Sequence, residues 1–145
     1  MATVLILAVM QAAASSSTVA TAASKFVPNV MWRSKSVLSA DFTCRGRKEQ
    51  AILGSSSTDI VIAVFVNGPT QSPEVLRYST QMRDPAKARL TLESLAYDAT
   101  DPDAPDLRKY RFSRSCKGLN LDDGRIDAAH IYWNPEAKRF EDWVR

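Results

Sequence analysis

The sequence predicts an all-β fold: a single-domain antiparallel sandwich, or an open barrel-like sheet, of about seven strands. Short segments rich in β-branched and aromatic residues recur between clusters of Gly, Pro, Asn, Asp and Ser, with little helical periodicity. One of these segments, residues 59–66, is apolar almost throughout. The stretch 46–53, which begins Gly-Arg, has a faint second copy at 124–131, which indicates that one hairpin design is used twice.

Each expected strand has its own signal. Residues 49–53 follow a polar loop and end at a serine-rich turn, and the unbroken apolarity of 59–66 is typical of a central strand covered on both faces. In 88–97 leucines alternate with polar residues, which favours a strand. In 108–114 basic residues alternate with aromatic ones, which favours a strand with one solvent-exposed face. The expected strands are 49–53, 59–66, 75–79, 88–97, 108–114, 126–133 and 139–144.

The last two strands are expected to form a hairpin around a five-residue loop at 134–138. In the simplest register His130 faces Asp142, Tyr132 faces Phe140 and Ala129 faces Trp143. A slip of one residue would change all of these pairs.

The N-terminal segment, residues 1–24, is interpreted as a signal peptide. It contains no Lys, Arg, Asp, Glu or His, and its short apolar run is followed by Ala, Ser and Thr, with Ala20-Thr21-Ala22 fitting a small-x-small cleavage site. The apolar run is too short for a membrane-spanning helix, so no membrane span is expected. Residues 25–40 are expected to be a linker leading to an edge strand, and 41–145 to be the β domain. The alternative for 1–24 is an unstructured Ala/Ser tail.

Charge and cysteine content narrow the function classes. The 19 basic residues are interspersed with 16 carboxylates rather than gathered on one stripe, which argues against nucleic-acid binding. The two cysteines, Cys44 and Cys116, fit a single disulfide in an oxidising compartment, so we expect a periplasmic or secreted protein. A metal site would want more Cys and His, and a catalytic thiol would depend on His130, the only histidine.

The loop before the first strand, 41–49, resembles the calcium loop of FG-GAP/VCBS-type repeats. Asp41 matches the first ligand position of that family, Gly46 the glycine and Glu49 the final acid. Arg45, however, stands where the family has an acid. A guanidinium there would repel Ca²⁺, so we expect Arg45 to pair with Asp41 or Glu49 and to replace the metal by an internal ion pair.

The second copy keeps more oxygen ligands. The resemblance implies a Ca²⁺ site there, with the ligands Asn120, Asp122, Asp123 and Asp127. The alternative is a solvated Asp-Asp-Gly turn that shapes the hairpin. No other cofactor is expected.

The chain as a whole resembles periplasmic lysozyme-inhibitor-like and immunity proteins, which implies a non-enzymatic protein that binds a cell-wall hydrolase. Because the cleft of such a hydrolase carries two catalytic carboxylates, an inhibiting surface needs small, hydrogen-bonding or cationic residues. A serine-rich tip and a basic segment with an aromatic anchor have this chemistry. The predicted partner-binding residues are Ser55, Ser56, Ser57, Arg108, Lys109, Tyr110 and Arg111.

Two other function classes are an enzyme and a carbohydrate-binding or structural module. Catalysis is not expected, because His130 opposite Asp142 is more often structural, and no G-x-S-x-G turn exposes a nucleophile. A carbohydrate-binding or structural envelope module is the alternative, because Trp133 and Trp143 fall on one face in the simple register and could stack on sugars.

Overall fold

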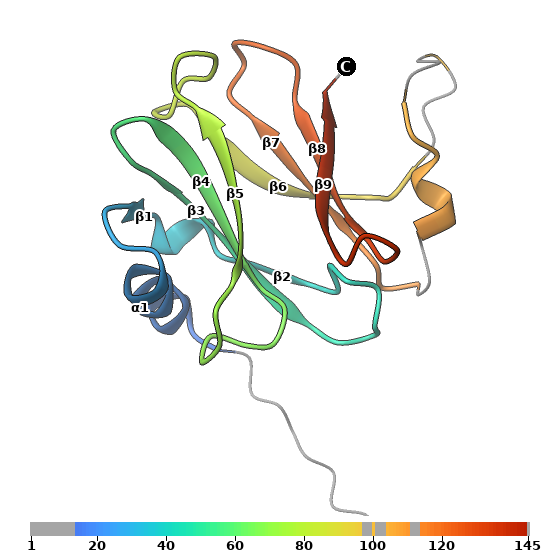
Figure 1. Ribbon diagram of the computed structural model, residues 1–145, viewed down its shortest axis with the longest axis horizontal. Helices are drawn as coiled ribbons and strands as arrows, with labels where there is room; N and C mark the ends of the chain where they lie inside the picture. Colours follow the sequence, from blue (N-terminus) through green and yellow to red (C-terminus); the bar gives the residue numbers. More distant parts are fainter. Residues whose placement is uncertain (1–13, 97–99, 101–103, 111–113, 145) are drawn as a thin grey trace, which may run out of the picture.

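Two antiparallel sheets face each other in a computed structural model of the chain, which describes residues 14–96, 100, 104–110 and 114–144 (Figure 1). The first sheet holds five strands: β1 (Met31–Trp32), β2 (Leu38–Ala40), β3 (Glu49–Ser55), β4 (Asp59–Phe65) and β5 (Glu74–Ser79). The second holds β6 (Arg89–Glu93), β7 (Gly118–Asp122), β8 (Ala129–Asn134) and β9 (Arg139–Val144), in that order. The predicted all-β sandwich is confirmed.

The main core lies between the two sheets. Alternate residues of β4 point into it, and Leu119, Leu121 and Ile131 face them from the second sheet, each at most 1% exposed. Period-2 alternation of apolar side chains places these residues on the inner faces of both sheets.

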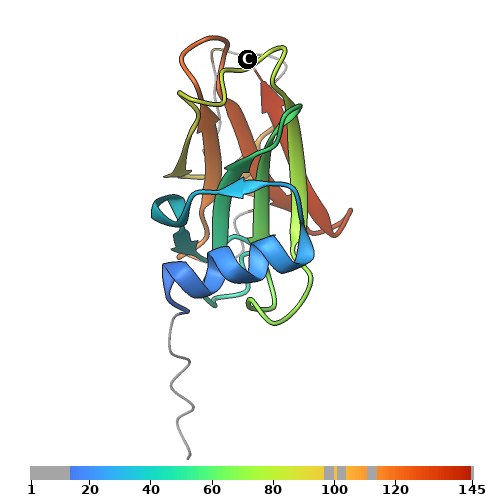
Figure 2. The same cartoon turned by 90° about the vertical axis from the view of Figure 1, so that its left-hand side faces the viewer.

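The first sheet is also covered on its outer face, by helix α1 (Ser16–Phe26), which lies across the strands in Figure 2. Val19 and Ala23 of α1 are fully buried against Ala63 and Phe65 of β4. The prediction that 59–66 forms a central strand covered on both faces is therefore confirmed. Burying a valine side chain contributes about 1.5–3 kcal/mol, so α1 is an integral part of this structure.

Helix α1 has ordinary boundary signals. The Ser15 hydroxyl accepts the Thr18 N–H as an N-cap at 3.3 Å, and the helix ends before Pro28, which disfavours the helical conformation at Val27. The helix includes Ala20-Thr21-Ala22, the expected cleavage site, while residues 1–13 lie outside the described chain. Export and processing stay predictions. Residues 25–40 hold the end of α1, β1, the 3₁₀ turn η1 (Ser34–Ser36) and β2, and both short strands pair with β3.

One predicted strand, 108–114, is wrong over its described part. Residues 107–110 form the 3₁₀ helix η2 (Leu107–Tyr110), and 111–113, with the predicted contact residue Arg111, lie outside the described residues. Leu107 and Tyr110 are one 3₁₀ turn apart, and both are buried against the second sheet. Burial at a spacing of three residues therefore outweighed the alternating pattern that favoured a strand.

The predicted register of the last hairpin is wrong by one residue. His130 pairs with Trp143, Tyr132 with Glu141 and Ala129 with Val144. Asn134 belongs to β8 and pairs with Arg139, which leaves a four-residue loop whose last residue, Lys138, has φ 52°. The Asn134 side-chain oxygen accepts the N–H groups of Glu136 and Ala137, at 3.0 and 3.2 Å. The slip places Trp133 and Trp143 on opposite faces, so the predicted shared aromatic platform does not form.

Candidate functional site

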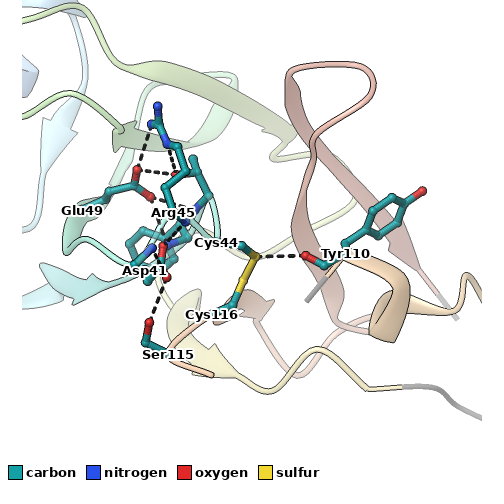
Figure 3. Close-up of a disulfide and its surroundings, with 10 residues drawn as sticks. Asp41, Cys44, Arg45, Glu49, Tyr110, Ser115 and Cys116 are labelled. Carbon is teal, nitrogen blue, oxygen red and sulfur yellow. Dashed lines mark hydrogen bonds and ion pairs between the residues drawn. A yellow bond between two sulfur atoms is a disulfide. The ribbon is translucent and has the colours of Figure 1, made fainter. Parts of the chain in front are cut away.

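The predicted disulfide, Cys44–Cys116, is present (Figure 3). It joins the loop before β3 to the residues that enter β7, with a Cα–Cα distance of 4.7 Å. Next to it, Asp41 and Cys116 form a parallel β-bridge, and the Lys117 N–H donates to the Asp41 carbonyl at 3.0 Å. The Tyr110 carbonyl oxygen of η2 lies 3.1 Å from the Cys44 sulfur. Three chain segments thus meet at this disulfide end of the sandwich.

The buried Asp41 carboxylate organises the loop 41–48. One oxygen accepts the Arg45 N–H at 2.9 Å, and the other accepts the Gly46 N–H at 2.8 Å and the Ser115 hydroxyl at 2.9 Å. Gly46 has φ +74°, a conformation that favours glycine and permits the sharp turn. In the calcium-loop pattern the Asp41 carboxylate would be the first ligand of the metal. Here its oxygens accept backbone N–H and hydroxyl donors instead.

Glu49, at the start of β3, is 2% exposed and is even more heavily engaged. Its carboxylate accepts the N–H groups of Phe42 and Thr43 at 3.0 and 2.8 Å and the Thr43 hydroxyl at 2.5 Å. The Arg45 guanidinium donates to it at 3.1 Å (Figure 3). The expectation that Arg45 forms an internal ion pair in this loop is confirmed, with Glu49 as the partner.

The second Gly-Arg loop, between β7 and β8, also holds a guanidinium. Arg83, from the connection between β5 and β6, is 2% exposed. Its guanidinium donates to the carbonyls of Leu121 and Asp127 at 3.5 and 2.8 Å and lies 3.6 Å from the Asp123 carboxylate. The pairing of Arg83 with this loop could not be predicted, because no sequence pattern around Arg83 links it to such a distant segment.

The Asp123 carboxylate is stabilised in its charged form. Burial would raise the pKa of Asp123, but N–H donors from Asp84, Arg125 and Ile126 and the Arg83 guanidinium together hold it below the ordinary value. The Asp84 N–H donates directly to this carboxylate. The buried charge is therefore compensated by hydrogen bonds and a cation.

The other predicted calcium ligands are dispersed. Asn120 lies within β7 and donates to Glu93 at 3.1 Å, while Asp122 accepts the Gly124 N–H at 2.8 Å. Within the described ranges no three His, Cys, Asp or Glu side chains form a group that could hold a metal ion. Ca²⁺ binding stays a prediction, and a cation there would have to compete with Arg83 for Asp123.

The predicted partner-binding residues lie in two separate places. Ser55 ends β3 and is almost fully buried, and the Ser56 hydroxyl accepts the N–H groups of Thr58 and Asp59 at 3.3 and 3.0 Å within a tight turn. Ser57 is exposed at the tip of that turn. Arg108, Lys109 and Tyr110 lie on η2, beside the disulfide, whereas the serine tip lies at the far end of β3. The structure does not bring the two sets together.

Basic side chains surround the disulfide. The loop 41–48 contributes Arg45, Arg47 and Lys48, which are exposed, and the neighbouring segments contribute η2 residues and residues next to Cys116. Arg47 donates to the Val66 carbonyl and the Asn67 side-chain oxygen, both at 2.8 Å, which fixes its guanidinium. We call this set the basic surface: Arg45, Arg47, Lys48, Arg108, Lys109, Arg114 and Lys117.

Four described acids lie near the basic surface. Asp41 and Glu49 are buried, and the Arg108 guanidinium donates to Asp106 at 2.8 Å and holds the pKa of Asp106 below its ordinary value. Glu136, whose charge acts on Lys109, is exposed. The seven cations outnumber these four acids, so the net charge at this end is positive. The contribution of the loop 41–48 to this surface was not predicted from the sequence, although the run Arg-Gly-Arg-Lys is a signal for it.

His130 has a different partner from the one expected. Its Nδ1 lies 3.0 Å from Glu93 on the outer face of the second sheet, and its ring stacks on Trp143 with centroids 4.4 Å apart. Gly118, which pairs with Glu93, lets β7 pack closely on its neighbours, because a Cβ there would lie 2.9 Å from the Ile131 backbone oxygen and 3.0 Å from the Leu95 Cδ2. The same face carries the stacked rings of Tyr110 and Tyr132.

The molecule is a β-sandwich with one disulfide. At the same end as the disulfide it presents a basic loop that is held by buried hydrogen bonds and an ion pair. None of the helices in the described residues is long and apolar enough to cross a membrane. Comparison with protein-family models, with curated proteins and with solved structures finds no match. Function has to be inferred from the geometry.

Proposed function

We propose that this protein is an exported, non-enzymatic binding protein that docks its basic surface on an acidic cleft of another protein. The partner class that fits best is a cell-wall hydrolase of the lysozyme type, whose cleft carries two carboxylates. Binding would inhibit the hydrolase or protect a cell from it. The observation that carries the proposal is the basic surface itself, presented on a loop fixed from within.

Rigidity supports this role. The loop 41–48 is held by the disulfide, by the Asp41 and Glu49 hydrogen bonds and by the contacts of Arg45 and Arg47 with the Val66 carbonyl. A surface that is already ordered loses little conformational entropy on binding, so more of the contact energy remains as affinity. A disulfide of this kind also persists in oxidising compartments, which agrees with export.

Charge supports the same role. Exposed cations on one protein speed up its association with a carboxylate-lined cleft on another, and they discriminate against basic partners. Tyr110 is buried and stacked on Tyr132, and the Lys109 ammonium lies 4.8 Å from its ring centroid, so this ring positions a cation of the basic surface. Arginine, which the basic surface also contains, is among the residue types enriched at the energetic centre of interfaces.

The surroundings of His130 favour binding over catalysis. A histidine base needs a nucleophile within hydrogen-bond reach. Among the residues that the structure describes, the Glu93 carboxylate and the Trp143 ring are the groups in hydrogen-bond or stacking contact with this imidazole. Neither of them is a hydroxyl or thiol nucleophile.

Affinity capture from envelope extracts, with a lysozyme-type activity assay alongside, tests the proposal. The wild-type chain should capture a wall hydrolase and slow its activity. The double variant Lys48→Glu/Lys109→Glu should weaken capture about tenfold or more at low salt, because two exposed cations become anions. Lys35, which is also exposed and lies on η1 away from the disulfide, supplies the matched control Lys35→Glu.

Two results would remove this role. The first is that the wild-type chain captures no hydrolase and inhibits none. The second is an equal loss in Lys48→Glu/Lys109→Glu and in Lys35→Glu, once the number of reversed charges is allowed for, because that points to net charge rather than to this surface.

A carbohydrate-binding or structural envelope module is the second candidate. One observation favours it: Glu93, Asn120, His130 and Trp143 lie together on the outer face of the second sheet and combine hydrogen-bonding groups with an aromatic ring. Retention on immobilised peptidoglycan that is lost in Trp143→Ala but kept in Lys48→Glu/Lys109→Glu would favour this module over the hydrolase inhibitor.

A further inference from the structure

A cavity of about 550 Å³ opens at the end of the molecule opposite the disulfide. It lies where the edge of the first sheet meets β6, and the loop 122–124 lines it on the other side. Along β6 the cavity adjoins Arg89, the first residue, whereas Glu93, the last, pairs with Gly118 near Cys116. Ligand pockets in proteins commonly measure about 300–1,000 Å³, so this space is large enough for a small molecule.

Three cationic side chains from separate segments line the cavity: Arg33 after β1, Lys87 before β6 and Arg89 in β6. Of the two acids in its lining, Asp123 is buried and paired with Arg83, which leaves Asp122 as the exposed one. The lining therefore carries a net positive charge, because three cations face one uncommitted carboxylate.

Arg33 is fixed in position before any ligand arrives. Its guanidinium donates to the Ala88 carbonyl at 2.8 Å and also to the Pro85 carbonyl. A guanidinium has five N–H donors, so others remain for a ligand, in the planar arrangement that matches a carboxylate or phosphate. Holding the group by backbone carbonyls keeps its charge uncompensated.

Arg89 pairs with Asp122 through the backbone of β6 and β7, but its exposed side chain makes no hydrogen bond or ion pair with the residues that the structure describes. Lys87 is also exposed, with its ammonium 3.8 Å from Asp84, a weak contact. Both side chains can turn toward an anion without breaking a strong native interaction.

We propose that this cavity binds a small organic anion that carries a phosphate or carboxylate group. Arg33 is the fixed contact, and Arg89 and Lys87 close over the anion from the rim. The site is independent of the basic surface, because the two lie at opposite ends of β6. A ligand here and a protein partner at the disulfide end can be bound together.

Titration calorimetry and thermal melting with inorganic phosphate and with citrate test this site, using sodium chloride at matched ionic strength as the reference. The wild-type chain should show saturable heat and a saturable rise in melting temperature, because a ligand that binds only the folded state stabilises it. Arg89→Gln should weaken binding at least fivefold. Arg77→Gln removes an exposed arginine from edge strand β5, outside the cavity, and should change binding less than twofold.

Binding of either probe supports the site, and the tighter one shows whether phosphate or carboxylate is preferred. No saturable signal with either probe would overturn the proposal. Equal weakening by Arg89→Gln and Arg77→Gln would overturn it too, because the anions would then be responding to net charge alone. Neither result bears on the basic surface, which has its own variants and its own assay.

Discussion

Glu49→Ala is the sharpest test of how the disulfide end is held. The substitution removes the acceptor of two backbone N–H groups, those of Phe42 and Thr43, and the partner of the Arg45 guanidinium, at a site that is 2% exposed. Each buried donor left without a partner costs about 1–3 kcal/mol, so the two N–H groups together cost about 2–6 kcal/mol, whereas the Arg45 side chain, which is 49% exposed, can be solvated by water. We expect the free energy of unfolding to fall by about 4 kcal/mol.

Urea unfolding gives that free energy directly, and the melting temperature should fall by about 15 °C for a domain of this size. Glu49→Gln should lie between the wild type and Glu49→Ala, because its amide keeps one acceptor but turns an NH₂ group toward the donors. Glu74→Ala, at an exposed position of β5, is the control and should change stability by at most about 0.5 kcal/mol.

A loss below about 1 kcal/mol in Glu49→Ala, or a Glu49→Gln variant as stable as the wild type, would refute this reasoning. Either result would mean that the buried carboxylate does not determine the conformation of the loop 41–48. The claim that the basic surface is ordered in advance of binding would then lose its main support.

Three further outcomes are expected. Replacing Cys44 and Cys116 by serine should cost about 4 kcal/mol in urea unfolding, from the loop entropy of a 72-residue separation; a loss under about 1 kcal/mol would contradict this. The pKa of Asp123 is lowered in the folded state, so the Asp123 carboxylate stabilises the fold above pH 3.8, the ordinary pKa of the group. This stabilisation is lost as the pH falls below that value. The urea midpoint of unfolding, measured from about pH 6 to 3, should therefore fall less steeply in Asp123→Asn than in the wild type. A chain that starts at Ala23 lacks buried Val19 and should melt lower than one that starts at Ala14; equal melting temperatures would show that α1 adds no stability.

Apolar pattern predicted the β-sheet core well. The strand β4 could be recognised because it is β-branched and apolar on both faces, a pattern that only a doubly covered strand tolerates. The ion pair of Arg45 was predictable for a similar reason: a cation in a loop with two nearby acids has few other partners. In both cases the signal lies within a few neighbouring residues.

Features that depend on distant contacts were missed. Helix α1 was not predicted, because its first half has no charged residues and the Ala-rich segment 1–24 predicts a signal peptide, which stays a prediction. Only the packing of α1 on β4 shows its place in the fold. The hairpin register depended on whether Asn134 belongs to the strand or to the loop, which pattern alone does not decide. Arg83 reaches Asp123 from 40 positions away in the chain, and no local signal marks that contact.

The position of the disulfide has a consequence for proteolysis. Cys44 and Cys116 enclose β3, β4, β5 and β6 in one covalent ring, together with the acidic, proline-containing segment 98–106. A single cut in that segment opens the ring but leaves the two fragments joined through sulfur. The clipped protein would keep its mass on a non-reducing gel and separate into two pieces only after a reducing agent is added.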